Sequence, residues 1–524
     1  MRVSIVLLLS TIFLPGNARY HNGGGRPFDT AVHDTNQVEL CISNYGKFGQ
    51  TGSFDPGCWW PKGSNHNYIF GAGIWFGTVD SGTGDTLVTI GYGPHGGEIE
   101  FVCGLEGMSI NHPDAIIFMY PENWPPPDTS LPMAPQDTVS HEDSWCCMND
   151  LDTNAHIPGD TRPIGIEMYQ TGYAWDIPQI EDIVFLTYEI KNVSGHGLYD
   201  CYVGIAADND IGNEAGTGND IIAGIVGQWY YIAGESLWVD AVGYQWQMEM
   251  ESTPAPPWWP GAIAFDLLET PLDLVEGQDK DNDGILDQYE RDSSYYWNNL
   301  PQSMWDVDYD NVPDWRDASE NPQFSMTAFK RFTLSAEPNI DAERYLTLAG
   351  YDFQTGVYNP YDTAPPLPDD QRFLMSSGPF DVPADSSIFM VFAVMLTDWD
   401  SLQVRPDTAI ALINKWAQLW YDMYWFLYTG IEEEHSYKVS SGLLITPNPV
   451  SGVAQVSFAT LHAGGLSVKL YNTVGQVVKD VVGEYVQAGF HTIDVDTRGF
   501  AQGTYFVVVE TPDCRVSRSL VILR

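Results

Sequence analysis

Residues 183–192 read IVFLTYEIKN, and this stretch decides the fold class. The apolar side chains at alternate positions from Val184 to Ile190 lie on one face of an extended strand. The glycine-rich turn VSGHG at residues 193–197 leads into a second apolar run at 198–207. Aromatic and β-branched residues dominate both runs, so we expect two strands that pair as a hairpin.

Similar short runs extend along the chain on both sides. Residues 68–79 and 86–92 flank SGTGD at 81–85, which predicts a hairpin. A proline-rich stretch at 121–135 is expected to be a surface loop, because each proline removes a ladder donor. Further strands are expected at residues 221–232, 372–376 and 388–396. Many short strands with glycine-rich turns predict a mainly β protein built from several β-sandwich domains.

One amphipathic helix interrupts the β pattern at residues 407–428. Asp407 is the expected N-cap, and Gly430 ends the pattern. An apolar stripe this wide is typical of a helix that packs on a core. The stripe consists of Ile410, Ile413, Trp416, Trp420, Tyr424 and Leu427.

The composition is strongly acidic. The 524 residues include 70 acidic and 23 basic side chains, for a formal net charge of −47. An aromatic content of 13% argues against disorder. The charge excludes most nucleic-acid roles, because phosphate binding needs a basic surface. An anionic surface does suit divalent cations.

The N-terminus has the features of a secretory signal peptide. Arg2 precedes an apolar stretch at 3–14, and small residues allow a cut after Ala18. We therefore expect residues 1–18 to direct Sec export into the periplasm. No other segment approaches the roughly 20 apolar residues needed to span a bilayer, so the mature chain is expected to have no transmembrane segment.

Cysteine and histidine spacing gives no zinc motif. Seven cysteines are too few for a disulfide scaffold in a chain of this length, and their pairing stays open. The absence of C-x-x-C and H-E-x-x-H argues against a zinc hydrolase.

Two acidic loops carry the spacing of oxygen ligands around calcium. Residues 279–290 read DKDNDGILDQYE, and residues 306–317 read DVDYDNVPDWRD. Alternate residues of a curled loop point inward, and Ca²⁺ takes six to eight oxygen ligands. Gly284 allows the tight turn in the first loop, where the second has Asn311. The expected ligands are the side chains of Asp279, Asp281, Asp283, Asp287, Glu290, Asp306, Asp308, Asp310, Asp314 and Asp317, with the carbonyl oxygens of Ile285 and Val312.

These loops resemble those of EF-hands, dockerins and thrombospondin type 3 repeats. Pro271 and Gly277 interrupt an entering helix, which favours the thrombospondin version. We expect calcium to act as a structural staple rather than a signal, because extracellular calcium modules bind weakly and stay loaded. A third oxygen-rich stretch, residues 208–210 with Asp220, has unspecific spacing. A solvated hairpin end is the preferred interpretation there, and a further calcium cage is the alternative.

The charge balance changes at residue 443. Six of the 23 basic and six of the 70 acidic residues lie at 443–524, so the whole net charge belongs to the preceding chain. Such a change marks a separate domain. Strands are expected there at residues 454–459, 466–471, 489–494, 503–509 and 519–523.

This last segment carries PNP at 447–449, the turn NTVGQ at 472–476, GTYFV at 503–507 and a basic, strand-forming end. It closely resembles the type A C-terminal sorting domain of substrates of the Por, or type IX, secretion system. The resemblance implies an immunoglobulin-like sandwich that engages the type IX secretion machinery, outer-membrane translocation, and removal of the domain at export. Arginine stands where lysine is common near the family's terminus.

The rest of the chain resembles a family of uncharacterised secreted proteins with this tail. The resemblance rests on SNYG at 43–46, YEIKN at 188–192, DNDIG at 208–212 and SSGPF at 376–380. It implies no activity. No G-x-S-x-G, P-loop or dinucleotide motif is present.

Two tryptophan pairs lie next to glycine and proline: Trp59-Trp60 and Trp258-Trp259. They are candidates for sugar stacking, although burial in a sandwich core is the commoner role of such residues. The preferred hypothesis is a secreted or outer-surface, calcium-binding, non-catalytic protein that binds a glycan or another surface polymer. Its rival is a secreted hydrolase of polysaccharide or protein.

The predicted division of the chain follows from these features. It comprises a signal peptide at 1–18, an N-terminal β domain at 19–160, a second β domain at 161–428, a linker at 429–442 and the sorting domain at 443–524. The second β domain contains the calcium-loop insertion at 277–320 and closes with the helix at 407–428.

Overall fold

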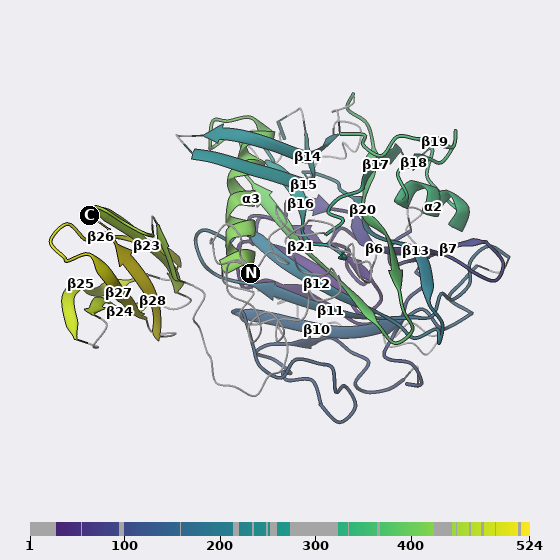
Figure 1. Ribbon diagram of the computed structural model, residues 1–524. Helices are drawn as coiled ribbons and strands as arrows, with labels where there is room; N and C mark the ends of the chain where they lie inside the picture. Colours follow the sequence, from purple (N-terminus) through teal and green to yellow (C-terminus); the bar gives the residue numbers. More distant parts are fainter. Residues whose placement is uncertain are drawn as a thin grey trace, which may run out of the picture.

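A computed structural model describes the chain from residue 28 to 423 and from 443 to 523. Within these ranges it leaves out residues 54, 94–98, 110, 158, 213–219, 233–234, 248–249, 252–258, 273–322, 334, 364–366, 447, 461–462, 473–475, 488 and 512–514. The signal peptide, the calcium-loop insertion and the linker of the sequence prediction therefore lie outside the described residues. The described part is mostly antiparallel β structure, as predicted, and it has two helices where the sequence predicted one (Figure 1).

The first large sheet has ten strands. They are β1 (Thr30–His33), β2 (Glu39–Ser43), β3 (Lys47–Phe48), β4 (Cys58–Trp59), β5 (Asn67–Ile69), β6 (Gly71–Val79), β7 (Thr86–Ile90), β13 (Leu198–Asp208), β17 (Ala328–Thr333) and β20 (Gln371–Val382). β13 lies between β6 and β20 and pairs with both. Strands from distant parts of the chain are therefore neighbours at the centre of this sheet.

The second large sheet has nine strands. They are β8 (Val102–Cys103), β9 (Phe118–Met119), β10 (Glu142–Asn149), β11 (Ile166–Ala174), β12 (Ile183–Asn192), β14 (Asp220–Ile232), β15 (Glu235–Gln247), β16 (Ala262–Glu269) and β21 (Ser387–Thr397). β14 forms one edge of the sheet and pairs with β15. A separate two-stranded ribbon joins β18 (Tyr351–Asp352) to β19 (Val357–Tyr358).

The main core lies between the two large sheets. The alternate residues of β12 that the sequence singled out, from Val184 to Ile190, all belong to it. Aromatic rings fill much of the space: Tyr188 stacks on Phe392 with ring centroids 5.7 Å apart, and Phe48 of the opposite sheet reaches the same Phe392 at 5.5 Å. Such contacts add about 0.5–1.5 kcal/mol per pair to the burial of the rings.

Each outer sheet face is partly covered by a helix. α3 (Pro406–Met423) packs on the nine-stranded sheet, where Ile410 and Trp420 are buried as the predicted stripe requires. Asp407 lies in the first turn of α3 rather than at its N-cap, because the helix begins one residue earlier. α2 (Asp341–Leu348) covers the ten-stranded sheet through Leu348. Its two turns are too short for a clear helical period, and the sequence prediction missed it.

The predicted hairpin of residues 183–192 and 198–207 is wrong. β12 pairs with β11 and β21, whereas β13 pairs with β6 and β20, so the turn at 193–197 carries the chain from one sheet to the other. The Asn192 amide fixes this crossing by donating to the carbonyl oxygens of His196 and Val382, at 2.7 and 2.9 Å. Alternation fixes which face of a strand is buried, but it does not say which strand lies beside it.

The predicted boundary between residues 160 and 161 falls inside this double sheet. β10 and β11, which flank it, are paired from Glu142↔Ala174 to Asn149↔Glu167. Both large sheets draw strands from each side of the boundary. The body is therefore one sandwich and not two successive β domains. The sequence analysis predicted a boundary here because local patterns do not show which distant strands pair.

The C-terminal module is a second, smaller sandwich. One sheet holds β22 (Leu443–Thr446), β23 (Val453–Thr460) and β26 (Gly489–Asp496), and the other holds β24 (Gly464–Asn472), β25 (Val477–Val486), β27 (Gly503–Glu510) and β28 (Arg515–Ile522). All five strands predicted in this segment are present. The module has its own core, which is almost wholly aliphatic, and it stands to one side of the body in Figure 1.

No helix among the described residues has the length and apolar character needed to cross a membrane. Cys41, Cys58, Cys146, Cys147 and Cys201 are buried free thiols. Burial raises the pKa of the Cys41 thiol to about 12, which keeps it protonated and unreactive.

Candidate functional site

The predicted calcium ligands at 279–290 and 306–317 all lie outside the described residues, so the structure does not test them. In the part of the chain that is described, no three His, Cys, Asp or Glu side chains converge as a metal-binding group. The described residues offer three other kinds of candidate site: buried polar clusters, a cavity and an exposed aromatic surface.

The acidic stretch at 208–210 is not a solvated hairpin end. Together with Asp220 and Gln245 it forms a buried group, called here the Asp220 cluster, in which Asp220, Asn209 and Gln245 are 1%, 2% and 0% exposed. The Gln245 Nε2 amide donates to the Asn209 carbonyl oxygen and to Asp220 Oδ2, both at 2.8 Å. The sequence prediction failed here because residues that look like a loop end lie between the two sheets.

Burial dominates the electrostatics of this cluster. It raises the pKa of Asp208 to about 6 and that of Asp210 to about 7, and it raises the pKa of Asp220 well above the ordinary value. Arg372 opposes the shift at Asp208, whose Oδ2 lies 3.0 Å from the guanidinium. More acidic groups are buried here than the neighbouring cation can neutralise.

A second buried group has the connectivity of a catalytic triad. His33 Nδ1 lies 3.1 Å from Glu142 Oε2, and His33 Nε2 lies 2.8 Å from Ser144 Oγ. A nucleophile must reach its substrate, however, and Ser144 and His33 are 1% and 0% exposed. A Cβ atom added to Gly172 on the neighbouring strand would lie 2.6 Å from Ser144 Oγ, so the space beside the serine is already filled.

Glu142 also has a structural task. Its Oε2 accepts hydrogen bonds from the backbone N–H groups of Asp34 and Thr35, at 2.8 and 3.3 Å. The group of three therefore fastens the turn after β1 to β10, and we assign it a structural role.

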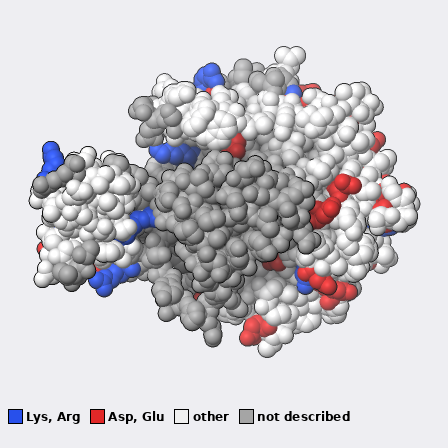
Figure 2. Space-filling view, viewed as in Figure 1, with Lys and Arg blue, Asp and Glu red and all other residues white. Residues whose placement is uncertain are grey.

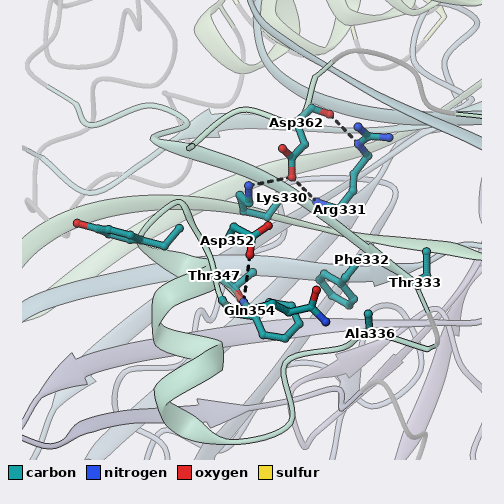
Figure 3. Close-up of a pocket in the computed structure, with 11 residues that line it drawn as sticks. Lys330, Arg331, Phe332, Thr333, Ala336, Thr347, Asp352, Gln354 and Asp362 are labelled. Carbon is teal, nitrogen blue, oxygen red and sulfur yellow. Dashed lines mark hydrogen bonds and ion pairs between the residues drawn. The ribbon is translucent and has the colours of Figure 1, made fainter. Parts of the chain in front are cut away.

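A cavity of about 230 Å³ opens between β17, the end of α2 and the β18–β19 ribbon (Figure 3). Lys330 and Arg331 line it, but both are engaged by one residue: Asp362 Oδ2 lies 2.9 Å from Lys330 Nζ, and the Asp362 carbonyl oxygen accepts from Arg331 Nε at 2.7 Å. Asp352 accepts from the backbone N–H groups that follow it. The charged groups of this cavity thus serve the fold, and their arrangement indicates no catalytic pair.

The tryptophans that the sequence suggested for sugar stacking are mainly structural. Trp60 is buried, donates its indole N–H to Asp182 Oδ1 at 2.6 Å, and packs edge-on against Tyr68. Trp259 packs against Trp399 with ring centroids 4.9 Å apart. Trp258 lies outside the described residues.

An exposed aromatic surface occurs instead on the β14–β15 hairpin. Trp229 and Trp238 are direct cross-strand partners with ring centroids 5.3 Å apart. They are 53% and 45% exposed, and Tyr231, two residues along the same face, is 79% exposed. These three residues are called here the aromatic face. The side chain of Trp238 lies across Gly227, where an added Cβ atom would be 2.8 Å from its ring.

The opposite face of the hairpin is anchored in the protein. Tyr230 and Val239 are buried in the core that α3 covers, and Figure 1 shows β14 and β15 extending above α3. The sequence prediction placed a strand at 221–232 but no partner beside it. Trp229 and Trp238 are each four residues from the sequence pair Ala233-Gly234, and this symmetry of the sequence would have revealed their pairing.

The C-terminal module differs from the body in its surface charge. On the face in Figure 2, acidic side chains gather on the body, and basic ones are prominent on the module. Asn448 of the PNP motif ties the start of the module to its last strand. Its Nδ2 donates to the Ser519 carbonyl oxygen at 2.9 Å, and its Oδ1 accepts from the Val521 N–H at 2.8 Å. The motif therefore has a clear structural purpose.

Comparison with protein families identifies this module. Residues 444–523 match the family described as "Secretion system C-terminal sorting domain". The segment is the sorting domain predicted from the sequence, and the protein is exported by a type IX system to the cell surface or the extracellular space.

Other comparisons add little. A search of curated proteins gave no match. Among solved structures, the chain is similar to dimeric latent PorU from Porphyromonas gingivalis, with 10% identity and a TM-score of 0.14 over 74% of this chain. The match covers 32% of that chain, so this protein spans about a third of its length. A likeness at this TM-score supports no argument about the body.

Proposed function

We propose that this protein is a non-catalytic binding protein that holds a glycan on the aromatic face of β14 and β15. The observation that carries the proposal is the exposed pair Trp229 and Trp238 on a two-stranded surface, with their rings tilted by 57° to each other. Large apolar side chains exposed together are typical of binding surfaces. Export by a type IX system brings this surface into contact with extracellular polymers.

The chemistry of the aromatic face suits a sugar. The apolar C–H face of a sugar ring stacks on an aromatic ring, while the indole N–H and the phenol O–H offer hydrogen bonds at the edge. Because Tyr230 and Val239 anchor the opposite side, little side-chain or strand ordering is needed when the ligand binds. A rigid, open platform is suited to one face of an extended polysaccharide rather than to a small enclosed ligand.

A pull-down with insoluble polysaccharides tests this proposal. The exported chain is mixed with a panel of polymers in calcium, and both bound protein and released soluble sugar are measured. We expect retention without release, and we expect the Trp229→Ala/Trp238→Ala variant to lose at least about tenfold in affinity, since each stacking ring contributes about 1 kcal/mol or more.

Tyr358→Ala is the matched control, because Tyr358 is an exposed aromatic residue on β19, away from the aromatic face. Unchanged retention of the double variant would refute the proposed surface. Release of soluble sugar would instead support the hydrolase hypothesis.

We also propose that residues 279–290 and 306–317 bind calcium as a structural staple. The support is the spacing of acidic residues in both loops and the glycine at the tight turn of the first. A ligand that binds only the folded state raises the melting temperature, so a chelator should lower it. A variant with Asp279→Asn, Asp281→Asn, Asp306→Asn and Asp308→Asn should show a smaller response; an equal response would contradict this proposal.

A further inference from the structure

The Asp220 cluster contains buried oxygen atoms with no hydrogen-bond donor. Asp220 Oδ1, Gln245 Oε1 and both polar side-chain atoms of Asn209, Oδ1 and Nδ2, each lack a hydrogen-bond partner in the part of the chain that is described. An unsatisfied buried polar atom costs about 1–3 kcal/mol, so an empty cluster with four of them is destabilised. Three of the four are oxygen acceptors.

Gln245 links the three residues that carry these atoms. The amide of Gln245 reaches both Asn209 and Asp220 through its Nε2, which places its Oε1 at the same cluster. Asp220 uses Oδ2 to accept from Gln245 and from the Ile211 N–H at 3.4 Å, and its Oδ1 is left over. A ligand that accepts electron pairs from oxygen would satisfy the three oxygen atoms.

The charge balance favours a cation as that ligand. The guanidinium of Arg372 already serves three carboxylates: Asp208 at 3.0 Å, Glu337 at 3.1 Å and Asp370 at 2.8 Å. Asp210 and Asp220 have no lysine or arginine within ion-pair distance among the described residues. One divalent cation would balance the buried carboxylate of Asp220 and the half-buried carboxylate of Asp210, on which Arg372 acts without forming an ion pair.

We propose that the Asp220 cluster binds a calcium ion, with the carboxylates of Asp210 and Asp220 and the amide oxygens of Asn209 and Gln245 as ligands. Calcium accepts side-chain amide and carboxylate oxygens in irregular geometry, whereas magnesium requires a near-ideal octahedron and keeps several waters. The set holds only two carboxylates, which agrees with the absence of a three-member metal group in the described chain.

The ion would join the two large sheets. Asn209 and Asp210 follow β13 of the ten-stranded sheet, while Asp220 and Gln245 belong to β14 and β15 of the nine-stranded sheet. Binding would therefore fasten the base of the hairpin whose far end carries the aromatic face. This site is independent of the loops at 279–317, since it uses none of their residues.

Calcium stoichiometry tests the proposal directly. The full exported chain is stripped with a chelator, dialysed against calcium, and assayed for bound metal by atomic emission. We expect Asp220→Asn to bind one calcium ion fewer than the unmodified chain, both alone and in the background of the four loop substitutions. Calcium should raise the melting temperature of the loop variant, and Asp220→Asn should abolish that rise.

Two further variants keep the test decisive. Asp210→Asn serves if Asp220→Asn does not fold, because Asp210 is less deeply buried. Asp369→Asn is the matched control, since Asp369 is an exposed carboxylate directly before Asp370 and is not among the proposed ligands. Unchanged calcium stoichiometry in both Asp220→Asn and Asp210→Asn would overturn the proposal. A second contradicting result is an Asp220→Asn variant that melts at a higher temperature than the unmodified chain in the absence of calcium and still binds the same number of calcium ions.

Discussion

The body and the C-terminal module are both antiparallel sandwiches, but they are built for different tasks. The body carries the whole net charge of −47 and fills its core with aromatic rings, whereas the module is charge-balanced and has one phenylalanine, Phe458, in an otherwise aliphatic buried core. The module matches a sorting-domain family, and the body carries the aromatic face and the Asp220 cluster. The match to the sorting domain and the proposed binding sites thus lie in separate sandwiches.

The largest expected effect is the loss of export when the sorting domain is removed. A chain that ends at residue 442 should fold but stay inside the cell envelope, because the sorting domain is missing. Fractionation of cells that have a type IX system measures this as at least a tenfold loss of extracellular protein. Normal export of the truncated chain would show that the body carries an address of its own.

A core substitution should affect the body alone. Trp420 is fully buried on α3 and packs edge-on against Trp175 with ring centroids 5.4 Å apart. Trp420→Ala should lower the stability of the body by about 3–5 kcal/mol because it leaves a large cavity. Denaturant unfolding followed by tryptophan fluorescence reports on the body, since the module contains no tryptophan. A loss below about 1 kcal/mol would mean that α3 is not part of the body's cooperative core.

A buried carboxylate should make the body's stability depend on pH. Burial raises the pKa of Asp341 to about 8. An acid with a raised folded-state pKa contributes stability at low pH that is lost as the pH rises from about 4 through that value. Asparagine does not titrate, so the melting temperature of Asp341→Asn relative to the unmodified chain should increase by a few degrees between pH 5 and pH 9. A constant difference would contradict the raised pKa.

A smaller effect is expected in the module. Asn448→Ala removes two hydrogen bonds that hold β28 and should cost about 1–2 kcal/mol there. Gln455→Ala on the exposed side of β23 is the control. Hydrogen exchange of β28 should accelerate in the first variant only, with the body unaffected. Faster exchange in the body would show that the two units unfold together.

The smallest effect should be seen at the buried Ser-His-Glu group. A fluorophosphonate probe should not label Ser144, because the hydroxyl is enclosed beside Gly172. Mass spectrometry of the probe-treated native protein checks this, with Ser144→Ala as the control. Specific labelling of Ser144 would reopen the hydrolase hypothesis.

These two units also differ in how far their sequence predicted them. In the module every predicted strand is present, because few residues separate its strands and their pattern matches a known domain. In the body, the alternation in β12 gave the buried face correctly, but the turn at 193–197 crosses between sheets. A short glycine-rich turn has the same local sequence in a hairpin and in a crossing, so only long-range pairing distinguishes them.

The candidate sites show the same limit. Trp59-Trp60 and Trp229 with Trp238 are all aromatic residues near glycine, yet Trp60 is buried and the second pair is exposed. Asp220 and residues 208–210 are distant in sequence from Gln245, and only the meeting of the two sheets brings them together. Local patterns pointed to tryptophan pairs and acidic stretches as candidate sites. Burial and strand order determine which of these side chains are exposed and which meet in one cluster.

One measurement tests the central claim most directly. An adsorption isotherm of the exported chain is recorded on the insoluble polysaccharide that retains most protein, beside the Trp229→Ala/Trp238→Ala and Tyr358→Ala variants, and each supernatant is assayed for soluble sugar. We predict saturable binding that falls at least about tenfold in the double tryptophan variant, is unchanged in Tyr358→Ala, and releases no sugar. Equal binding by all three proteins, or sugar in the supernatant, would contradict a non-catalytic role for the aromatic face.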